Sequence, residues 1–391
     1  MRYEEVAWDV HPVTGMSRQD RSWMGRPYRA AVTPAIAALD PTPSSRVMAE
    51  AEEAAYEIRT FDQEVGHEIA PFAAVLLRTE SAASSQIEQL SASARRIAEA
   101  EVLGGGSGHA GQIVGNVRAM TTALGLAHRI DADSILAMHH ALVGESDPDI
   151  AGQWRPDQVW IGGPPRMGAG SPHTAHFVPP VAGRVRLAVD DLVTFAARED
   201  LAVMPQTAVA HAQFETIHPF PDGNGRTGRA LMHAMLKGKG LTRTVSVPIS
   251  SGLLVDTNAY YDALTAYREG DVDPIVSCVS RAALIGVGNG RQLVRELNAI
   301  REGWSDRLEG LRADSAARRL AEGLFAHPVI TNVIGRQLLG AQRNEHRNID
   351  ALVERGILVV HTDHKTRNRL WRAPDVLAAL DRYAARAGRR R

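Results

Sequence analysis

Apolar residues recur every three or four positions along most of this chain, which is the spacing that places them on one face of an α-helix. The pattern is helical from residue 45 to residue 101, with a second stretch starting near Pro71. The side chain of Asp131 can cap the start of the helix that follows it. The chain is therefore predicted to be mainly α-helical. Further helices are predicted over residues 115–127, 131–143, 185–197, 207–217, 226–237 and 258–267.

Two regions interrupt this helical pattern. Residues 1–45 are rich in proline and charge and have weak periodicity, so we expect an extended arm that leads into the first helices. Residues 144–182 contain a strand-like stretch at 158–161 and nine prolines or glycines between 162 and 180. A connection of this length inside a compact domain is usually functional or disordered. A functional loop and a structural insertion are both open at this point.

The pattern changes again near the C-terminus. It predicts a helix over 331–339, a turn, a second helix over 344–355, and two strands at 356–360 and 368–373. Two helices followed by a hairpin predict a winged helix. Residues 343–391 carry twelve Lys or Arg against six Asp or Glu, which favours DNA as a partner. Three acidic residues on the second helix favour a protein-docking or dimer module instead, and both interpretations stay open: Glu345, Asp350 and Glu354.

Composition excludes several classes of protein. The net charge of the 391 residues is -1, which gives no general attraction to nucleic acid or to an acidic membrane. Cys278 is the only cysteine, so no disulfide can form within the chain. The N-terminus lacks the basic start and apolar core of a signal peptide, and no run of about 18 apolar residues occurs. We therefore expect a soluble, cytoplasmic protein with no membrane partner.

The segment from His218 to Arg229 contains most of the groups that phosphate chemistry needs. His218 has an unperturbed pKa of about 6.5 and can take a proton from a hydroxyl at neutral pH. Asp222 is an oxygen ligand of the kind that Mg²⁺ accepts, and Mg²⁺ needs only one or two protein carboxylates. A loop at 223–225 leads into a predicted helix, and a helix start binds anions. The order of these groups predicts phosphoryl or nucleotidyl transfer.

Arg226 and Arg229 strengthen this interpretation. They lie three residues apart, so they share one face of the predicted helix, and their side chains lean back toward its N-terminus. Two guanidinium groups that face one anion favour a polyphosphate.

The same segment, His-Pro-Phe-Pro-Asp-Gly-Asn-Gly-Arg-Thr-Gly-Arg, resembles the signature of the Fic family at every fixed position. The resemblance implies a protein adenylyltransferase that transfers AMP from ATP, with Mg²⁺, to a Ser, Thr or Tyr hydroxyl of a protein target and releases pyrophosphate. It implies that His218 is the base, that Phe220 anchors the loop and that Asp222 holds Mg²⁺. The α- and β-phosphates would lie against Gly223, Asn224 and Gly225, and the β/γ end would lie against Arg226 and Arg229. The implied catalytic residues are His218, Asn224, Arg226 and Arg229.

The family resemblance extends to two other parts of the chain. Residues 158–180 resemble the β-hairpin flap that holds the target segment by strand addition. Tyr260 and Tyr261 match the place where Fic proteins line the nucleotide pocket, although aromatic residues on a helix are more often part of a core.

A segment near the N-terminus resembles the inhibitory helix of Fic proteins. Ser84 and Glu88 are four residues apart and share a helix face. The resemblance implies that Glu88 pairs with Arg229, and a carboxylate on that guanidinium would remove the γ-phosphate contact. Gln89 departs from the family pattern, which has Gly or Asn there. Whether Glu88 also supports removal of AMP is open.

The resemblance gives a complete expected organisation. We expect a mainly α protein with a Fic-type helical core, a small β-hairpin flap and a C-terminal winged-helix domain. Residues 1–110 would form the regulatory region, 111–300 the catalytic core, and 301–391 a linker helix and the winged helix. Transfer of a different nucleoside monophosphate and a nucleotide-sensing DNA-binding regulator are the alternatives, and a homodimer is left open.

Overall fold

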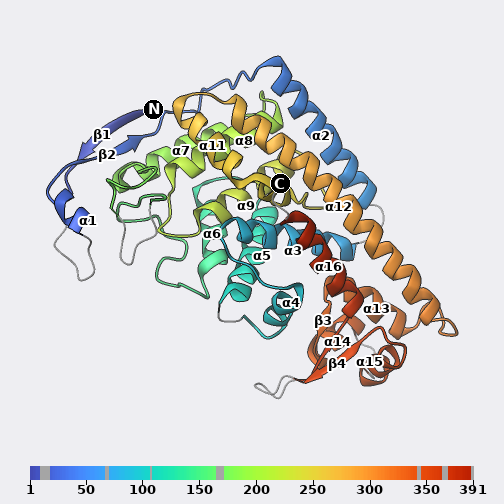
Figure 1. The fold of residues 1–391 in the computed structure, drawn as a ribbon. Helices are drawn as coiled ribbons and strands as arrows, with labels where there is room; N and C mark the ends of the chain where they lie inside the picture. The colour runs from blue at the N-terminus through green and yellow to red at the C-terminus, as the bar shows by residue number, and fades with distance from the viewer. Residues whose placement is uncertain are drawn as a thin grey trace.

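Helices dominate the computed structural model of this protein, as the sequence predicts (Figure 1). The structure describes residues 1–8, 18–66, 70–105, 108–163, 171–340, 345–362 and 369–388. The N-terminal half contains α1 (Arg18–Trp23), α2 (Ser45–Gly66), α3 (Ala70–Ile87), α4 (Ala94–Val102), α5 (His109–Gly125), α6 (Ala132–Val143) and α7 (Ala182–Ala197). The middle contains α8 (Val203–Ile217), α9 (Asn224–Gly238), α10 (Ile249–Leu253), the short 3-10 helix η1 (Leu254–Asp256), α11 (Thr257–Glu269) and α12 (Asp273–Arg307).

Helix α8 is the centre of the core. Every residue from Met204 to Ile217 is buried, because α2, α7, α9, α11 and α12 all pack against it. A helix that is enclosed on all sides must satisfy its polar side chains internally. Gln213 does so by donating to the carbonyl oxygen of Pro34 at 2.9 Å and accepting from the hydroxyl of Tyr267 at 2.8 Å. The two helices that flank the predicted phosphate segment, α8 and α9, are thus fixed by the core.

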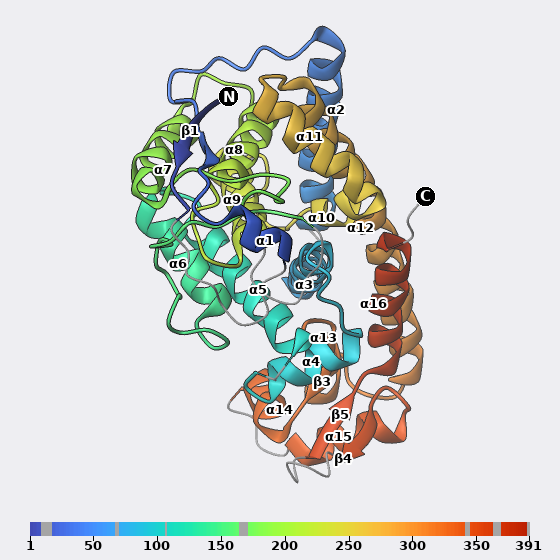
Figure 2. The same ribbon diagram turned by 60° about the vertical axis from the view of Figure 1, so that its left-hand side comes forward.

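Most predicted helices are confirmed to within a few residues. Helix α6 begins where expected, and its Asp131 side chain accepts from the backbone N–H of Ser134 at 2.8 Å. The long α12 was not predicted as a single element, and the predicted domain boundary at residue 300 falls inside it. In Figures 1 and 2, α12 runs along one side of the molecule, beside α2 at one end and α16 (Pro374–Ala387) at the other.

The N-terminal arm is more ordered than its weak periodicity predicts. Strands β1 (Arg2–Val6) and β2 (Tyr28–Val32) pair antiparallel, with Glu4 opposite Ala30. The backbone N–H of Ala31 donates to the carbonyl oxygen of Val178 at 3.0 Å. Tertiary pairing therefore decides the conformation of this arm, and the arm covers the segment that was predicted as a flap.

The predicted flap contains less regular sheet than expected. Its two arms meet at one antiparallel bridge between Ile161 and Phe177, and residues 164–170 between them lie outside the described part of the chain. Prolines follow Gly163 and flank residues 173–178, and a proline has no backbone N–H to donate to a neighbouring strand. This composition limits strand pairing in the two arms.

The C-terminal part contains the predicted helices and strands. They are α14 (Asn332–Leu339), α15 (Glu345–Glu354), β4 (Val359–Thr362) and β5 (Arg369–Arg372), to which the structure adds α13 (Ala316–Ala326), β3 (Val329–Ile330) and α16. The strands form one antiparallel sheet in the order β3-β5-β4. This part packs on the N-terminal region through α4 and α3 (Figure 2). The winged-helix assignment and the three-domain division stay predictions.

Among the residues that the structure describes, no helix is long and apolar enough to cross a membrane.

Candidate active site

The phosphate segment forms a tight loop between α8 and α9. Helix α8 ends at Ile217, and His218 follows in the left-handed conformation with φ 50° and ψ 63°. Its side chain is 21% exposed, and its Nδ1 lies 3.9 Å from Glu215 Oε2. Burial, and next the positive charge of Arg155, lower the pKa of His218 to about 3. The imidazole is therefore neutral at pH 7 and can accept a proton.

One aromatic stack and the hydrogen bonds of its histidine hold the loop against the core. Phe220 is fully buried, as predicted, and its ring stacks on His139 with centroids 3.8 Å apart. His139 Nδ1 accepts from the backbone N–H of Gly152 at 3.1 Å, so Nε2 carries the proton and donates to the carbonyl oxygen of Asp222 at 3.0 Å. Burial lowers the pKa of His139 to about 4, which keeps it neutral. The sequence analysis missed His139, since a histidine on an apolar helix face gives no distinguishing signal.

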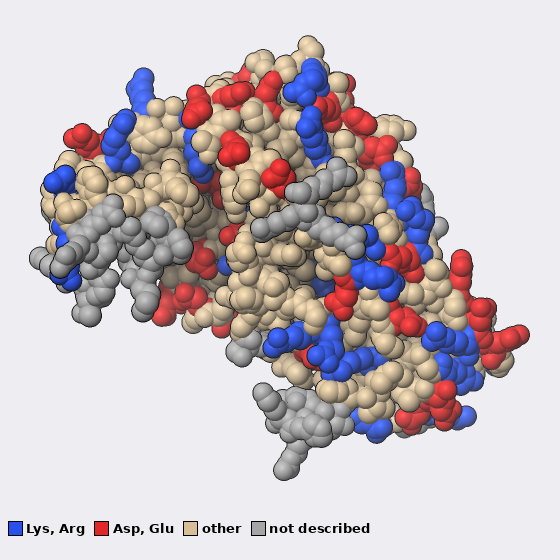
Figure 3. All heavy atoms as spheres, viewed as in Figure 1, with Lys and Arg blue, Asp and Glu red and all other residues tan. Residues whose placement is uncertain are grey.

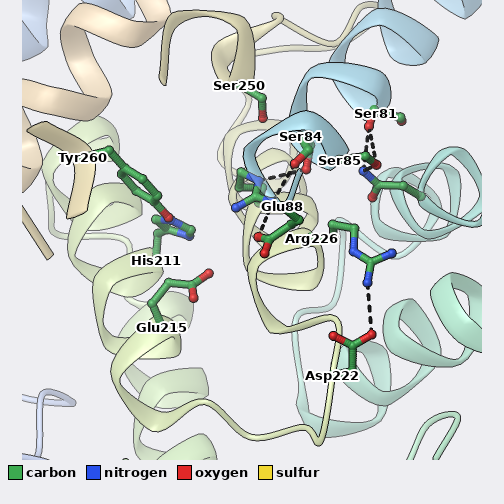
Figure 4. A network of polar contacts seen from close by, with 12 residues as sticks. Ser81, Ser84, Ser85, Glu88, His211, Glu215, Asp222, Arg226, Ser250 and Tyr260 are labelled. Carbon is green, nitrogen blue, oxygen red and sulfur yellow. Dashed lines mark hydrogen bonds and ion pairs between the residues drawn. The ribbon is translucent and has the colours of Figure 1, made fainter. Parts of the chain in front are cut away.

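The fixed backbone of Asp222 leaves its carboxylate at the surface. The side chain is 69% exposed, and Oδ2 lies 3.3 Å from Arg226 Nη2 (Figure 4). No group of three or more His, Cys, Asp or Glu side chains that could hold a metal alone occurs in the described chain. A cation at Asp222 would therefore depend on phosphate oxygens and water for its remaining ligands, which is the usual arrangement for Mg²⁺.

Asn224 braces the loop with its side chain. Its Oδ1 accepts from the backbone N–H of Phe220 at 2.8 Å, and its Nδ2 donates to the carbonyl oxygen of Phe220, also at 2.8 Å. Gly223 precedes α9 with φ 77°, where a side chain would meet Leu142. These contacts fix the start of α9, and helix N-termini are places where anions bind, while the Asn224 side chain itself is engaged by protein.

The carboxylate of Glu88 lies against the start of α9. A Cβ placed on Gly225 would lie 2.0 Å from Glu88 Oε1, so only glycine lets the carboxylate approach α9 so closely. Arg229 Nη2 donates to the same Oε1 at 2.9 Å. Arg229 also donates from Nε to Ser84 Oγ and from Nη2 to the Ser84 carbonyl oxygen, both at 2.8 Å (Figure 4). The structure thus brings together the three residues that the resemblance links: Ser84, Glu88 and Arg229.

Electrostatics reinforces this contact. Arg229 is 1% exposed, and burial alone would lower its pKa, but Glu88 and, less strongly, Tyr260 and Glu215 raise it above the ordinary value. The Glu88 side chain is 39% exposed, so it can leave Arg229 for solvent. The end of α3 also holds Gln89 in a left-handed conformation with φ 63°.

A second contact joins α3 to α9 deeper in the core, and on α9 it lies one helix turn beyond Arg229. Glu80 Oε1 lies 3.0 Å from His233 Nε2, and Glu80 also accepts from the backbone N–H of Ser250 at 2.9 Å and from its hydroxyl at 2.5 Å. Glu80 is completely buried and His233 is 2% exposed. Neither residue was predicted from the sequence, because they are 153 positions apart.

A cavity of about 640 Å³ opens beside the α8–α9 loop. His218, Gly225, Arg229 and Glu88 line one side of it. The flap bridge lines another side, and α11 lines the rest with Tyr260 and Tyr261 among its residues. Tyr260 is buried with its hydroxyl 2.8 Å from His211 Nε2, whereas Tyr261 is 48% exposed. A molecule in this cavity would contact the neutral histidine, the start of α9 and the flap together.

Glu215 is a further acid on the cavity wall that the sequence analysis missed. It is 7% exposed, and its Oε1 has no hydrogen-bond partner among the described residues. Burial raises its pKa to about 7, with Glu88 also raising it and Arg229 and Arg268 opposing. It faces the same space as Glu88 in Figure 4.

The sequence of the site matches the Fic/DOC family over residues 129–236. These residues form a Fic domain. The chain is similar to "Protein adenylyltransferase fic-1" of Caenorhabditis briggsae, with 32% identity over 158 residues, and to "Protein adenylyltransferase Fic" of Drosophila yakuba, with 31% identity over 160 residues. These alignments cover 39% and 40% of this chain. The chain spans 27% and 28% of the lengths of these two relatives.

The fold around the Fic domain also has a solved counterpart. A Fic family protein from Desulfovibrio desulfuricans G20 matches with a TM-score of 0.50 and 22% identity, over 88% of this chain and 97% of that one. At this identity the match establishes the fold alone. The 88% of this chain that is covered is more than the residues 129–236 of the Fic domain.

Proposed function

We propose that this protein is an autoinhibited adenylyltransferase that transfers AMP from ATP to a Ser, Thr or Tyr hydroxyl of a protein target. The observation that carries the proposal is the shared cavity, in which the neutral imidazole of His218 lies beside the α9 anion site and Arg229. In the reaction, the target oxygen attacks the α-phosphorus and its proton passes to His218. The bond from the α-phosphorus to the oxygen that bridges it to the β-phosphorus breaks, and pyrophosphate leaves. The names of the curated relatives support this chemistry for the Fic domain.

The phosphates have a defined place in this proposal. Backbone N–H groups of Gly223, Asn224 and Gly225 would face the α- and β-phosphates at the start of α9. Arg226 and Arg229 would hold the β/γ end, since guanidinium groups bind phosphate oxygens with two hydrogen bonds. An anionic nucleotide beside His218 would raise the pKa of the imidazole from its low value and make it a better base. Bound Mg²⁺ at Asp222 would neutralise developing charge on the leaving pyrophosphate.

The two other parts of the site have separate roles. Tyr260 and Tyr261 would contact the nucleoside, because they line the cavity on the side of α11. The target segment would lie along the flap, near the bridge between Ile161 and Phe177. Both sides of the cavity are then occupied by substrate.

Autoinhibition follows from the position of Glu88. Its carboxylate and the terminal phosphates of ATP would compete for the Arg229 guanidinium and for the space above Gly225. Nucleotide could then bind only in a pose that lacks the Arg229 contact, so transfer would wait until Glu88 moves. Removal of AMP is part of this proposal: the same exposed carboxylate would orient a water molecule that attacks the phosphorus of the modified target, and the bond from that phosphorus to the target oxygen would break, which releases AMP and the free hydroxyl.

The nucleotide donor and the need for His218 are tested together. Wild type and Glu88→Gly would be incubated with Mg²⁺ and ATP, GTP, UTP or CTP carrying a labelled α-phosphate, and the label on protein counted. We expect transfer from ATP that falls at least about 100-fold in His218→Ala, since a positioned base contributes roughly 10²- to 10⁴-fold. His346→Ala removes an exposed histidine of α15 and should change nothing. Equal transfer by His218→Ala, or no transfer from any triphosphate, would refute the proposal, and transfer from another triphosphate would correct the donor.

DNA binding by the C-terminal elements is the second predicted function, and the described residues give it little support. Arg336 pairs with Glu345 at 2.7 Å, and Arg382 and Arg386 both pair with Glu296. Lys or Arg and Asp or Glu lie side by side over this part in Figure 3. Arg367 lies outside the described residues, while Arg369 lies over the ring of Trp371 at 5.2 Å. The predicted positive excess is therefore partly neutralised within the chain.

A further inference from the structure

One buried arginine outside the Fic signature connects the flap to the catalytic loop. Arg155 is 2% exposed and lies in the segment that leads into the flap. Its Nε donates to the carbonyl oxygen of His218 at 2.8 Å, and its Nη1 donates to that of Asp157 at 2.9 Å. Its Nη2 donates to the carbonyl oxygen of Pro180, at the far end of the flap. One guanidinium thus joins both ends of the flap to the residue that carries the base.

These contacts complete the end of α8. The last carbonyl groups of a helix have no partner within the helix, and a cation there is favourable. Arg155 Nη2 lies 3.5 Å from the carbonyl oxygen of Ile217, and the backbone N–H of Arg155 donates to that of Pro219 at 2.9 Å. Three consecutive carbonyl groups, from 217 to 219, therefore face Arg155.

The backbone of His218 needs this support. A residue with a side chain is strained at a φ of 50°, and such a conformation persists only where the surroundings hold it. The direction of the imidazole depends on that backbone conformation. A small rotation at His218 would move the ring relative to the α-phosphate position, and misplacement by about 1 Å can cost roughly 100-fold in rate.

Arg155 also acts through its charge. Burial lowers the pKa of the Arg155 guanidinium to about 10, so it stays positive at neutral pH. Burial is the main cause of the low pKa of His218, and Arg155 is the next. Arg268 of α11 also lowers that pKa, whereas Asp222 and the backbone of Glu215 raise it. Tyr28 of β2 is the other titratable group coupled to Arg155.

We propose that Arg155 is a positioning residue for the transfer reaction, which orients His218 through its carbonyl group and couples that orientation to the flap where the target binds. The inference rests on the proposed role of His218 as the base. It assigns Arg155 two separable contributions, a geometric one from the planar guanidinium and an electrostatic one from its charge.

Two substitutions separate these contributions. Arg155→Lys keeps the charge but cannot reach several carbonyl groups with one planar group, whereas Arg155→Gln loses the charge as well. We expect kcat to fall about tenfold or more in both, with KM for ATP little changed, because the phosphates contact α9. The acid limb of the pH–rate profile should keep its position in Arg155→Lys and move to higher pH in Arg155→Gln.

The experiment uses the Glu88→Gly background, with His218→Ala measured beside it. Histidine-selective NMR gives the pKa of His218 directly, and the missing signal in His218→Ala identifies its resonance. An upward shift of that pKa in Arg155→Gln but not in Arg155→Lys, in variants that unfold near the wild-type temperature, supports the inference. An unchanged pKa in both variants, or an unchanged kcat in Arg155→Lys, overturns it. Loss of the transfer reaction's dependence on His218 would instead overturn the proposed function, and the NMR result would still stand.

Discussion

Helix α3 contacts helix α9 at two places that differ in burial and in their partners. The inner contact consists of Glu80 with His233 and Ser250, and it is closed to solvent. The outer contact consists of Glu88 with Arg229, and there the carboxylate is 39% exposed. Buried carboxylates with several partners are costly to disturb, while exposed ion pairs contribute little stability. The difference indicates that the inner contact fixes α3 in place and that the outer contact can open.

The strongest test of this comparison is the stability of the fold. Glu80→Ala removes the acceptor of three hydrogen-bonding groups and leaves His233 buried, so we expect the free energy of unfolding to fall by about 3–5 kcal/mol. Glu88→Ala should cost less, because the Glu88 carboxylate is 39% exposed and the buried Arg229 keeps its two hydrogen bonds to Ser84. Urea unfolding of both variants measures the two values. Equal losses would show that the contacts do not differ as their burial indicates.

The second test concerns the rate of AMP transfer. For this rate we expect the outer contact to matter more than the inner one, which is the opposite of the order expected for stability. Glu88→Gly frees the Arg229 guanidinium for the terminal phosphate, and we expect the rate of AMP transfer to rise about tenfold, which corresponds to about 1.4 kcal/mol from the regained phosphate contact. Glu354→Gly is a matched control, since Glu354 is an exposed glutamate at the end of α15. Initial rates with labelled ATP measure the effect. A rate in Glu88→Gly no higher than in the control would remove the proposed autoinhibition.

The outer contact was expected and the inner one was not. The family resemblance implied the pairing of Glu88 with Arg229, whereas spacing alone could not, because the two residues are 141 positions apart. Glu80 and His233 belong to no local motif, and only the packing of α3 on α9 brings them together. Arg155 and His139 likewise act on the backbone of distant residues, 63 and 83 positions away. A single sequence carries no signal for such pairs.

The secondary-structure elements also differ in how far local sequence predicts them. Helices α5 to α9 were predicted from the spacing of their apolar residues, and α6 also from its capping residue Asp131. The pairing of β1 with β2 and the passage of α12 across residue 300 depend on long-range packing, so the sequence pattern did not reveal them.

The smallest expected effect concerns the residue that follows Glu88, whose backbone conformation fixes the end of α3. Gln89 has φ 63°, and the N–H of Leu90 donates to the Ser85 carbonyl oxygen at 3.0 Å, so the chain must turn in the left-handed region here. Gln89→Gly removes the strain of a side chain in that region, and we expect about 0.5–1 kcal/mol of added stability. A less strained end of α3 should keep Glu88 on Arg229 for more of the time, so we also expect a lower rate of AMP transfer than in wild type.

Gln89→Ala provides the control, because alanine keeps a Cβ in the same left-handed conformation. Urea unfolding and initial transfer rates measure the two properties. If Gln89→Gly and Gln89→Ala are equally stable and equally active, the strain at this position does not influence the outer contact.

In the proposed mechanism, the guanidinium of Arg229 holds either Glu88 or the terminal phosphate of the nucleotide. Isothermal titration calorimetry with ATP and with ADP, on wild type and on Glu88→Gly, distinguishes these two states of Arg229. We expect similar dissociation constants for the two nucleotides in wild type, and about tenfold tighter binding of ATP than of ADP in Glu88→Gly, which is a gain of about 1.4 kcal/mol from the freed contact. The preference should disappear again in Glu88→Gly with Arg229→Lys. An ATP preference that is the same with and without Glu88 would contradict the account.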